Sequence, residues 1–304
     1  MPSDSFVPAT RFEKEIDLEL RFPPLPRTIT EVAKLQSKGV PDTKLLGEIV
    51  HADPVIGASV LRRINSAYYG LSRRVGDVKR AVRLLGFNEV CNIVTTAGMV
   101  SLKDAIGTDE QATIFTNLMR LSIGAAYIAE VLHDELQLPS ALTFTTALLH
   151  PVGRLTLLFN RPDDYEALWY TSDTGTVPTS ANEKAIFGMD HAEAGGLTCE
   201  KWELPSEMST AIRHYLAPTM VEDMADEILA LTIAVSSHAA IQLGLHSGDQ
   251  TDEPYVPTTH ARRLLDTLAK MRPKAEAFTT DDVTYLIEQQ RAKALAYVDA
   301  MAVA

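Results

Sequence analysis

Residues 51–70 read HADPVIGASVLRRINSAYYG, and this stretch decides the class of fold. Asp53 can cap a helix with its side chain, and Pro54 suits the first helical position, where its missing N–H costs nothing. Apolar residues then recur at helical spacing as far as Ile64, and Gly70 supplies a turn. The stretch therefore predicts a short capped helix that ends in a tight turn.

The flanking segments show the same organisation. Further helices are expected over residues 27–35, after Asp42, over residues 78–85 behind Asp77, and over residues 88–100. Gly86 is expected to stop the helix before it, because glycine adopts the left-handed conformation that ends helices. Five short helices with capped turns predict a compact bundle over residues 21–105, preceded by an extension over residues 1–20.

The rest of the chain, beyond a polar stretch at 103–110, is also expected to be helical. Helices are expected over residues 113–133, 141–159 with an interruption at 150–153, 181–188, 190–202, 205–216, 225–243, 258–271 and 280–301. Thr279 and Asp282 have the spacing of a weak capping box before the last of them. Period-two alternation is scarce and no internal repeat is found. The sequence therefore predicts an all-α fold of two packed helical bundles, the second over residues 110–302.

The amino-acid composition indicates which kinds of partner and which cellular compartment to expect. A formal net charge of −12 disfavours DNA and anionic membranes as general partners, because like charges repel. Cys91 and Cys199 belong to no CxxC pattern, which is typical of buried thiols in a reducing compartment. The first 20 residues lack the apolar core of a signal peptide, and no apolar run is long enough to span a bilayer. We therefore expect a cytoplasmic protein without membrane insertion.

One segment departs from the acidic average. Seven cations fall within 22 residues and are opposed only by Asp77: Arg62, Arg63, Arg73, Arg74, Lys79, Arg80 and Arg83. Such a cluster could bind an anionic nucleotide such as cyclic di-GMP, or an acidic surface of a partner protein. It could equally be the solvated face of two helices and a loop, paired with the chain's own carboxylates.

The sequence carries no GxGxxG, Walker A, GxSxG or HExxH motif. Three of its eight histidines stand out by position. His150 interrupts an apolar helix, His191 follows Asp190 at a helix start, and His214 lies within a helix. Histidines on several helices can build a metal site in a bundle core, although capped or surface histidines would show the same pattern.

Eight segments together resemble the HDOD family in order and spacing, over about residues 20–245. They are FPPLP at 22–26, EIVHADP at 48–54, LRRINSAYYG at 61–70, VKRAVRLLG at 78–86, LLHPVGRL at 148–155, FGMDHAEAG at 187–195, WELP at 202–205 and AIRH at 211–214. The hallmark residues in this resemblance are Asp53, Pro54, Asn65, Ser66, Tyr68, Tyr69 and Gly70. We interpret them as structural, with Asn65 and Ser66 bonding backbone groups at the helix end. The aromatic pair could instead face a partner or an interface.

The resemblance also implies that metal-binding residues have been lost. HDOD domains resemble HD phosphohydrolases, which hold divalent metals through a His, an adjacent His-Asp pair and a distant Asp. In this chain the pair corresponds to His150-Pro151, the first His to Leu121 and the last Asp to Ser237. His191 and His214 match histidines of later helices. A metal of this class needs carboxylate and imidazole ligands, and three of these positions provide neither.

The resemblance therefore implies a non-catalytic bacterial signal-transduction or scaffold module without a cofactor. It would act through protein partners, could bind a nucleotide second messenger in a relict pocket formed by His150, His191, His214 and Ser237, and could dimerise. The alternative is a metal-dependent phosphohydrolase of the HD superfamily with a rearranged set of ligands.

Overall fold

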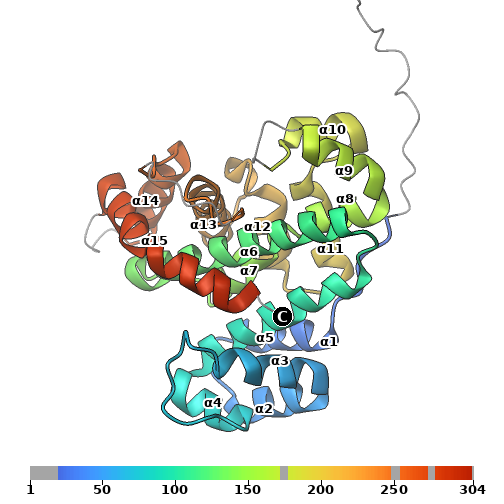
Figure 1. Ribbon diagram of the computed structural model, residues 1–304. Helices are drawn as coiled ribbons and strands as arrows, with labels where there is room; N and C mark the ends of the chain where they lie inside the picture. Colours follow the sequence, from blue (N-terminus) through green and yellow to red (C-terminus); the bar gives the residue numbers. More distant parts are fainter. Residues whose placement is uncertain (1–19, 172–176, 248–253, 273–277, 303–304) are drawn as a thin grey trace, which may run out of the picture.

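The computed structural model describes residues 20–171, 177–247, 254–272 and 278–302. Within these ranges the protein is built of helices and contains no strand, which confirms the all-α prediction (Figure 1). The expected N-terminal extension lies outside the described residues except for Leu20. Residues 172–176 and 248–253, each between two of the expected helices, lie outside them as well.

Five α-helices and a short 3-10 helix form the first part of the fold. They are α1 (Arg27–Gln36), α2 (Thr43–Ala52), α3 (Pro54–Ile64), α4 (Val78–Leu85), α5 (Phe87–Ser101) and η1 (Leu102–Ala105). The three predicted aspartate caps are confirmed. Asp53 accepts hydrogen bonds from the backbone of Val55 and Ile56 at 3.2 and 3.1 Å, and Asp42 and Asp77 cap α2 and α4 in the same way.

Asn65 closes the loop between α3 and α4. Its amide nitrogen donates to the carbonyls of Leu61 and Val75 at 2.6 and 2.8 Å, and its oxygen accepts from the Val75 N–H at 2.7 Å. Gly70 turns the same loop with a φ of +54°, a conformation that favours glycine. The expected side-chain bond of Ser66 is wrong: its hydroxyl is buried without a hydrogen-bond partner among the described residues.

The remaining helices form the larger part. They are α6 (Asp109–Leu136), α7 (Thr143–Leu149), α8 (Val152–Asn160), α9 (Pro162–Thr171), α10 (Ser180–Phe187), α11 (His191–Lys201), α12 (Ser206–His214), η2 (Pro218–Met220), α13 (Met224–Gln242), α14 (Thr259–Met271) and α15 (Thr280–Ala302). Helix α6 begins earlier than expected because Thr108 caps it. Helix α9 was not expected at all; its short apolar face buries Tyr165 and Leu168.

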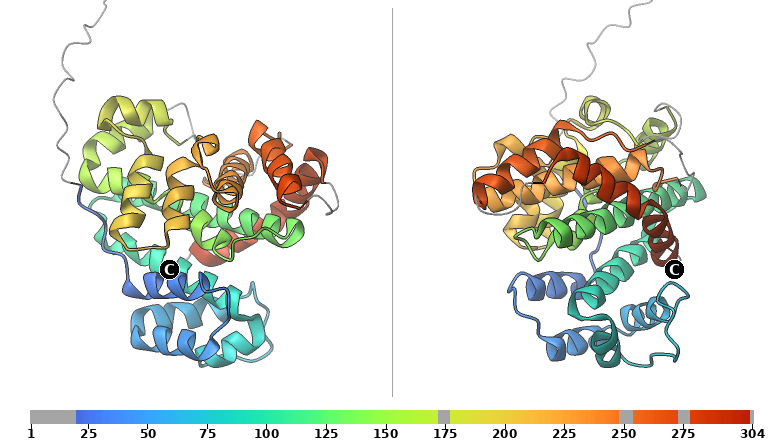
Figure 2. Two further views of the ribbon diagram at one scale, coloured as in Figure 1. Left: turned by 180° about the vertical axis from the view of Figure 1, so that it is seen from behind. Right: turned by 90° about the vertical axis from the view of Figure 1, so that its left-hand side faces the viewer.

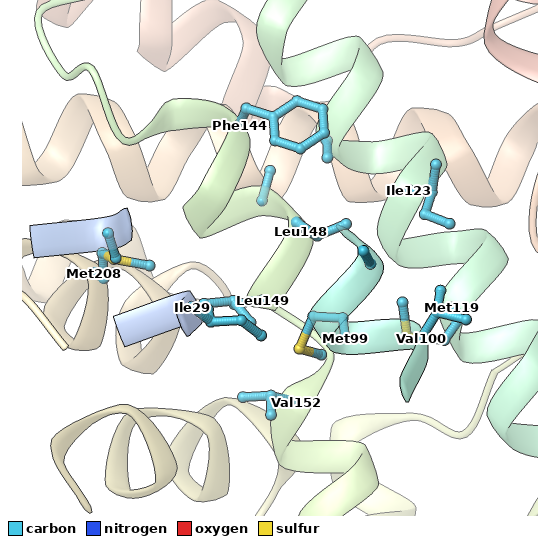
Figure 3. Close-up of a cluster of buried hydrophobic side chains, with 14 of the residues drawn as sticks. Ile29, Met99, Val100, Met119, Ile123, Phe144, Leu148, Leu149, Val152 and Met208 are labelled. Carbon is cyan, nitrogen blue, oxygen red and sulfur yellow. The ribbon is translucent and has the colours of Figure 1, made fainter. Parts of the chain in front are cut away.

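The buried side chains form two clusters. The larger runs from α1 to α12 and reaches the end of α15, while the smaller lies between α6, α13, α14 and α15. In Figure 3, Ile29 of α1 and Met99 of α5 pack close to Leu149 of α7 and Met208 of α12. The expected division of the chain near residues 105–110 falls between η1 and α6, and residues on both sides of it share the larger cluster.

Helix α13 is long and apolar enough, by composition alone, to cross a membrane. It instead packs against α6, α12 and α14, and most of it is buried (Figure 1). This is the pattern of a core helix in a helical protein. The apolar composition of α13 is therefore only weak evidence that this helix spans a membrane.

Candidate functional site

The interruption at His150-Pro151 separates α7 from α8 and brings α8 against α11. A Cβ atom placed on Gly153 would lie 1.9 Å from the carbonyl oxygen of His191 and 2.5 Å from the N–H nitrogen of Gly195. Only glycine allows backbones to approach so closely. Gly153 thus lets the start of α8 touch the first turn of α11, and this contact places Arg154 beside His191.

A buried ion pair lies at this contact. Arg154 donates to the carboxylate of Glu183 at 2.5 Å and to the carbonyl of Pro178 at 2.8 Å, and Glu183 is fully buried. His191 bonds the same carboxylate through Nδ1 and its backbone N–H. Burial alone would raise the pKa of Glu183, but Arg154 and the His191 hydrogen bonds outweigh it and hold this pKa below its usual value.

His191 has no nitrogen left for a metal. Burial, followed by the charge of Arg154, lowers its pKa, so its ring is neutral. Nδ1 carries the proton and donates to Glu183, and Nε2 accepts from the Tyr215 hydroxyl at 2.6 Å. Arg154 Nη2 lies 3.3 Å from the same Nε2. Both ring nitrogens are therefore engaged within the protein.

His150 and His191 come together around Tyr215, a residue that the sequence argument did not select. The two imidazole centroids lie 5.6 and 5.8 Å from that of Tyr215. His150 is buried, and its Nδ1 donates to the carbonyl of Ala147 at 2.6 Å. Burial lowers its pKa to about 3. His214 ends α12 outside this cluster, and its neighbour Tyr215 points inward instead.

A cavity of about 330 Å³ opens beside the cluster, between α8, α10, α13 and α14. Ser237 lines it, as does His191, so two of the four predicted relict-pocket residues reach it. The remaining polar lining comes from residues that were not predicted: Arg154, Thr179, Ser180, Tyr215, His238, Thr258 and His260. Within the described residues, no Asp or Glu belongs to this lining.

The residues present do not fit the metal that the family resemblance implies. Leu121 is buried in the apolar cluster around α6 and α13, and Pro151 has no side-chain donor. Ser237, at the position where the resemblance implies the distant carboxylate, carries only a hydroxyl. Among the described residues, no group of three His, Cys, Asp or Glu side chains is placed to hold a metal ion. Divalent metals of this class need several such donors together, so we derive no step through a metal.

Five of the seven predicted cations lie exposed on the first part of the fold: Arg62, Arg73, Arg74, Lys79 and Arg83. Arg80 is half-buried. Among the described residues, none of these six takes part in a recorded ion pair, and Asp77 is used to cap α4. A groove of about 670 Å³ lies between α2, α3 and the start of α4, and its charged lining is Lys79 with Glu48 and Asp77. We call the six side chains the basic surface.

Arg63 does not belong to the basic surface, which corrects the sequence-based assignment. Its side chain is buried and donates through Nε and Nη2 to the carbonyl of Met301, at 3.2 and 3.0 Å, and through Nη1 to Ser59 at 2.5 Å. Arg63 thus joins α3 to the end of α15, which reaches the first part of the fold in Figure 2.

The aromatic pair of the signature stretch also lies at an interface within the chain. The Tyr68 ring meets the rings of Tyr69 and Tyr297 edge-on at 5.1 and 5.3 Å. The Tyr69 hydroxyl donates to Glu89 at 2.5 Å. These contacts join α3 and its loop to α5 and α15. They agree with a structural role for the pair.

Comparison with known proteins gives a family and a fold. The family model of the HDOD domain matches residues 22–218. An uncharacterized protein from Treponema pallidum (strain Nichols) is 22% identical over 216 residues, which cover 70% of this chain and 41% of that protein. The chain thus spans about two fifths of that relative's length.

Three solved structures share the fold. An HDOD domain protein of unknown function from Geobacter sulfurreducens has a TM-score of 0.74 at 17% identity, covering 92% of each chain. A candidate signal transduction protein from Marinobacter aquaeolei VT8 has a TM-score of 0.67 at 19% identity, covering 93% of this chain and 60% of that one. A candidate phosphohydrolase from Shewanella amazonensis SB2B has a TM-score of 0.63 at 21% identity, covering 92% and 95%. At these identities the likeness is one of fold.

Proposed function

The chain belongs to the HDOD domain family, and from that premise we propose that it is a non-catalytic signal-transduction module. The family is related to metal-dependent phosphohydrolases, so the hydrolase is the natural alternative. One observation carries the proposal: where a catalytic metal would need ligands, the chain offers Leu121, Pro151 and a His191 whose two ring nitrogens are already engaged. Without a metal-bound hydroxide, the site has no nucleophile for a phosphodiester.

Signalling would then operate through a protein partner, and the basic surface is the proposed docking site. Its six cations lack recorded ion pairs among the described residues, whereas cations such as Arg27 and Lys44 pair with carboxylates one turn away. Unpaired cations beside a groove attract an acidic surface and speed its association. A cyclic dinucleotide is the alternative ligand of this surface, because guanidinium groups also bind phosphates. The buried thiols of Cys91 and Cys199 agree with a reducing cytoplasm.

Hydrolysis is tested on the full chain with cyclic di-GMP and a chromogenic phosphodiester, in the presence of Mn²⁺ or Fe²⁺. We expect no turnover above buffer. Turnover that requires the added metal and saturates with substrate would establish the hydrolase instead. A catalytic metal centre accelerates such reactions by many orders of magnitude, so even a weak enzyme would be detected.

The basic surface is tested with a labelled acidic peptide and with labelled cyclic di-GMP. The variant reverses Arg73, Arg74, Arg80 and Arg83 to Glu. A matched control reverses four exposed cations elsewhere: Lys103, Arg262, Lys270 and Lys293. We expect the first variant alone to lose peptide binding, with helix content unchanged by circular dichroism. If both variants bind the peptide as tightly as the wild type does, the basic surface is only a solvated face of the protein.

A further inference from the structure

We propose that the cavity between α8, α10, α13 and α14 is a metal-independent anion site for a small phosphate monoester. This inference rests on the proposed function, because a bound catalytic metal would itself bind the phosphate. The ligand would carry one phosphate on a body no larger than a single nucleoside. Besides the relict-pocket residues His191 and Ser237, the cavity is lined by His238, Thr258 and His260, which the sequence did not single out.

The charge of the lining favours an anion. Arg154, His191, His238 and His260 all border the cavity, and within the described residues no carboxylate does. Two carboxylates lie just behind this lining: Glu183 is fully buried and held by Arg154 and His191, and Asp190 accepts from the Ser180 hydroxyl at 3.0 Å and pairs with Lys184. A lining of one arginine and several neutral donors, with the nearby carboxylates already paired, favours an anion over a cation.

Two helices direct their N-terminal ends at the same space. Thr179 and Ser180 border the cavity at the start of α10, and Thr258 and His260 border it at the start of α14. Helix N-termini carry partial positive charge and unpaired N–H groups, so they bind phosphate oxygens. Two such ends converging beside an arginine reinforce the preference for an anion.

Thr258 provides an independent sign of a missing partner. It occupies the N-cap position of α14, where a threonine hydroxyl ordinarily accepts a backbone hydrogen bond. Here the side chain makes no capping bond. Its Oγ1 is buried and has no hydrogen-bond partner among the described residues. A buried hydroxyl without a partner is costly, and a phosphate oxygen at this position would satisfy it.

The two unpredicted histidines are suited to bind phosphate. One ring nitrogen of His238 bonds the carbonyl of Val256, which leaves the other for a ligand. Burial lowers the pKa of His238; burial, followed by repulsion from His238 and Arg263, lowers that of His260. Both shifts favour the neutral imidazoles when the cavity holds no anion. A dianion between them would stabilise their protonated forms and gain charge-assisted hydrogen bonds.

The shape of the cavity limits the size of the ligand. The remaining lining is apolar and comes from Val177, Pro178, Leu216, Ala234 and Ile241. Ligand cavities in proteins span about 300–1,000 Å³, and this one lies at the lower end of that range. The mixture of polar and apolar lining suits a ligand with one anionic group and one compact apolar or aromatic body. A cyclic dinucleotide, with two nucleobases, is too large for it.

The test measures binding of AMP, inorganic phosphate and adenosine to the full chain by thermal shift and calorimetry, with EDTA present throughout. We expect saturable stabilisation by AMP, weaker stabilisation by phosphate and none by adenosine, since ligands that bind the folded state alone raise its stability. The double variant H238Q/H260Q should bind AMP about tenfold more weakly or worse, because glutamine cannot be protonated and its hydrogen bonds to the phosphate lose their charge assistance.

Two further variants keep the outcome interpretable. T258V removes only the unpartnered hydroxyl and preserves the side-chain shape, so weaker AMP binding with an unchanged Tm supports the site. H51Q/H214Q removes two histidines outside the cavity and should bind AMP like the wild type. The inference is overturned if neither AMP nor phosphate stabilises the chain saturably, or if H238Q/H260Q and T258V both bind like the wild type. The proposed function is tested separately. Metal-dependent turnover of phosphodiesters would refute it, whatever the result of the AMP-binding experiment.

Discussion

Replacing Gly153 by alanine should destabilise the fold although the position is helical. The new Cβ would lie 1.9 Å from the His191 carbonyl oxygen, and ordinary contact begins at 3.4 Å, so α8 and α11 must separate by well over 1 Å. The new Cβ would meet backbone atoms, so no flexible side chain can move to relieve the clash. Helix propensity favours alanine by up to about 1 kcal/mol. Overpacking of a core costs about 1–3 kcal/mol and occasionally more. Because the clash is with backbone, we expect a net loss of about 2–4 kcal/mol.

Equilibrium unfolding in guanidinium chloride measures this loss, with far-UV circular dichroism as the probe. Gly76 provides the matched control, since a Cβ there meets nothing within 4 Å and its φ is not positive. Gly76→Ala should therefore change the free energy of unfolding by no more than about 0.5 kcal/mol. If Gly153→Ala were as stable as the wild type, the close approach of α8 to α11 would be wrong. The placement of Arg154 against His191 would then be wrong too.

Three further outcomes follow from buried groups. Arg63→Met should lose about 1–3 kcal/mol of stability and speed hydrogen exchange in the last turn of α15, because a buried carbonyl loses its donors. Burial, then Asp134, raises the pKa of Glu130 to about 7, so the wild type loses stability as pH rises from about 4.5 through 7. Glu130→Gln should thus be the more stable protein above pH 7, by at most about 3 kcal/mol, and show no such gain near pH 4 in urea titrations. Cys91 and Cys199 should react with a thiol reagent only on unfolding, because burial raises both thiol pKa values, that of Cys199 to about 12.

Local chemistry explains what the sequence could predict. The caps at Asp42, Asp53 and Asp77 depend on a side chain and a backbone two or three residues away, so spacing alone reveals them. The break at His150-Pro151 is local for the same reason. The sequence also shows that Pro151 and Leu121 cannot bind a metal through their side chains, because proline and leucine lack donor atoms in any fold. The caps and the helix break were predicted correctly because no tertiary contact is needed to form them.

The composition of the cavity depends on contacts between distant segments. Arg154 bonds a carboxylate 29 residues away, and Tyr215 meets His150 across the bundle. One signal was present: Arg154 is a lone cation in the apolar run from Val152 to Leu158, and a cation in such a run is buried only with a partner. No comparable signal marked His238 or His260, since neither has a distinctive neighbour. Arg63 was misassigned because the sequence does not reveal that α15 returns to α3.

Metal stoichiometry tests the central claim most directly. The full chain would be unfolded in chelator, refolded with excess Mn²⁺ or Fe²⁺, desalted and analysed by elemental mass spectrometry. The proposed function predicts metal content well below one ion per chain, equal to that of a variant in which His150 and His191 are replaced by Gln. One tightly held ion per chain, lost in that variant while the fold is retained, would contradict the account and restore the hydrolase.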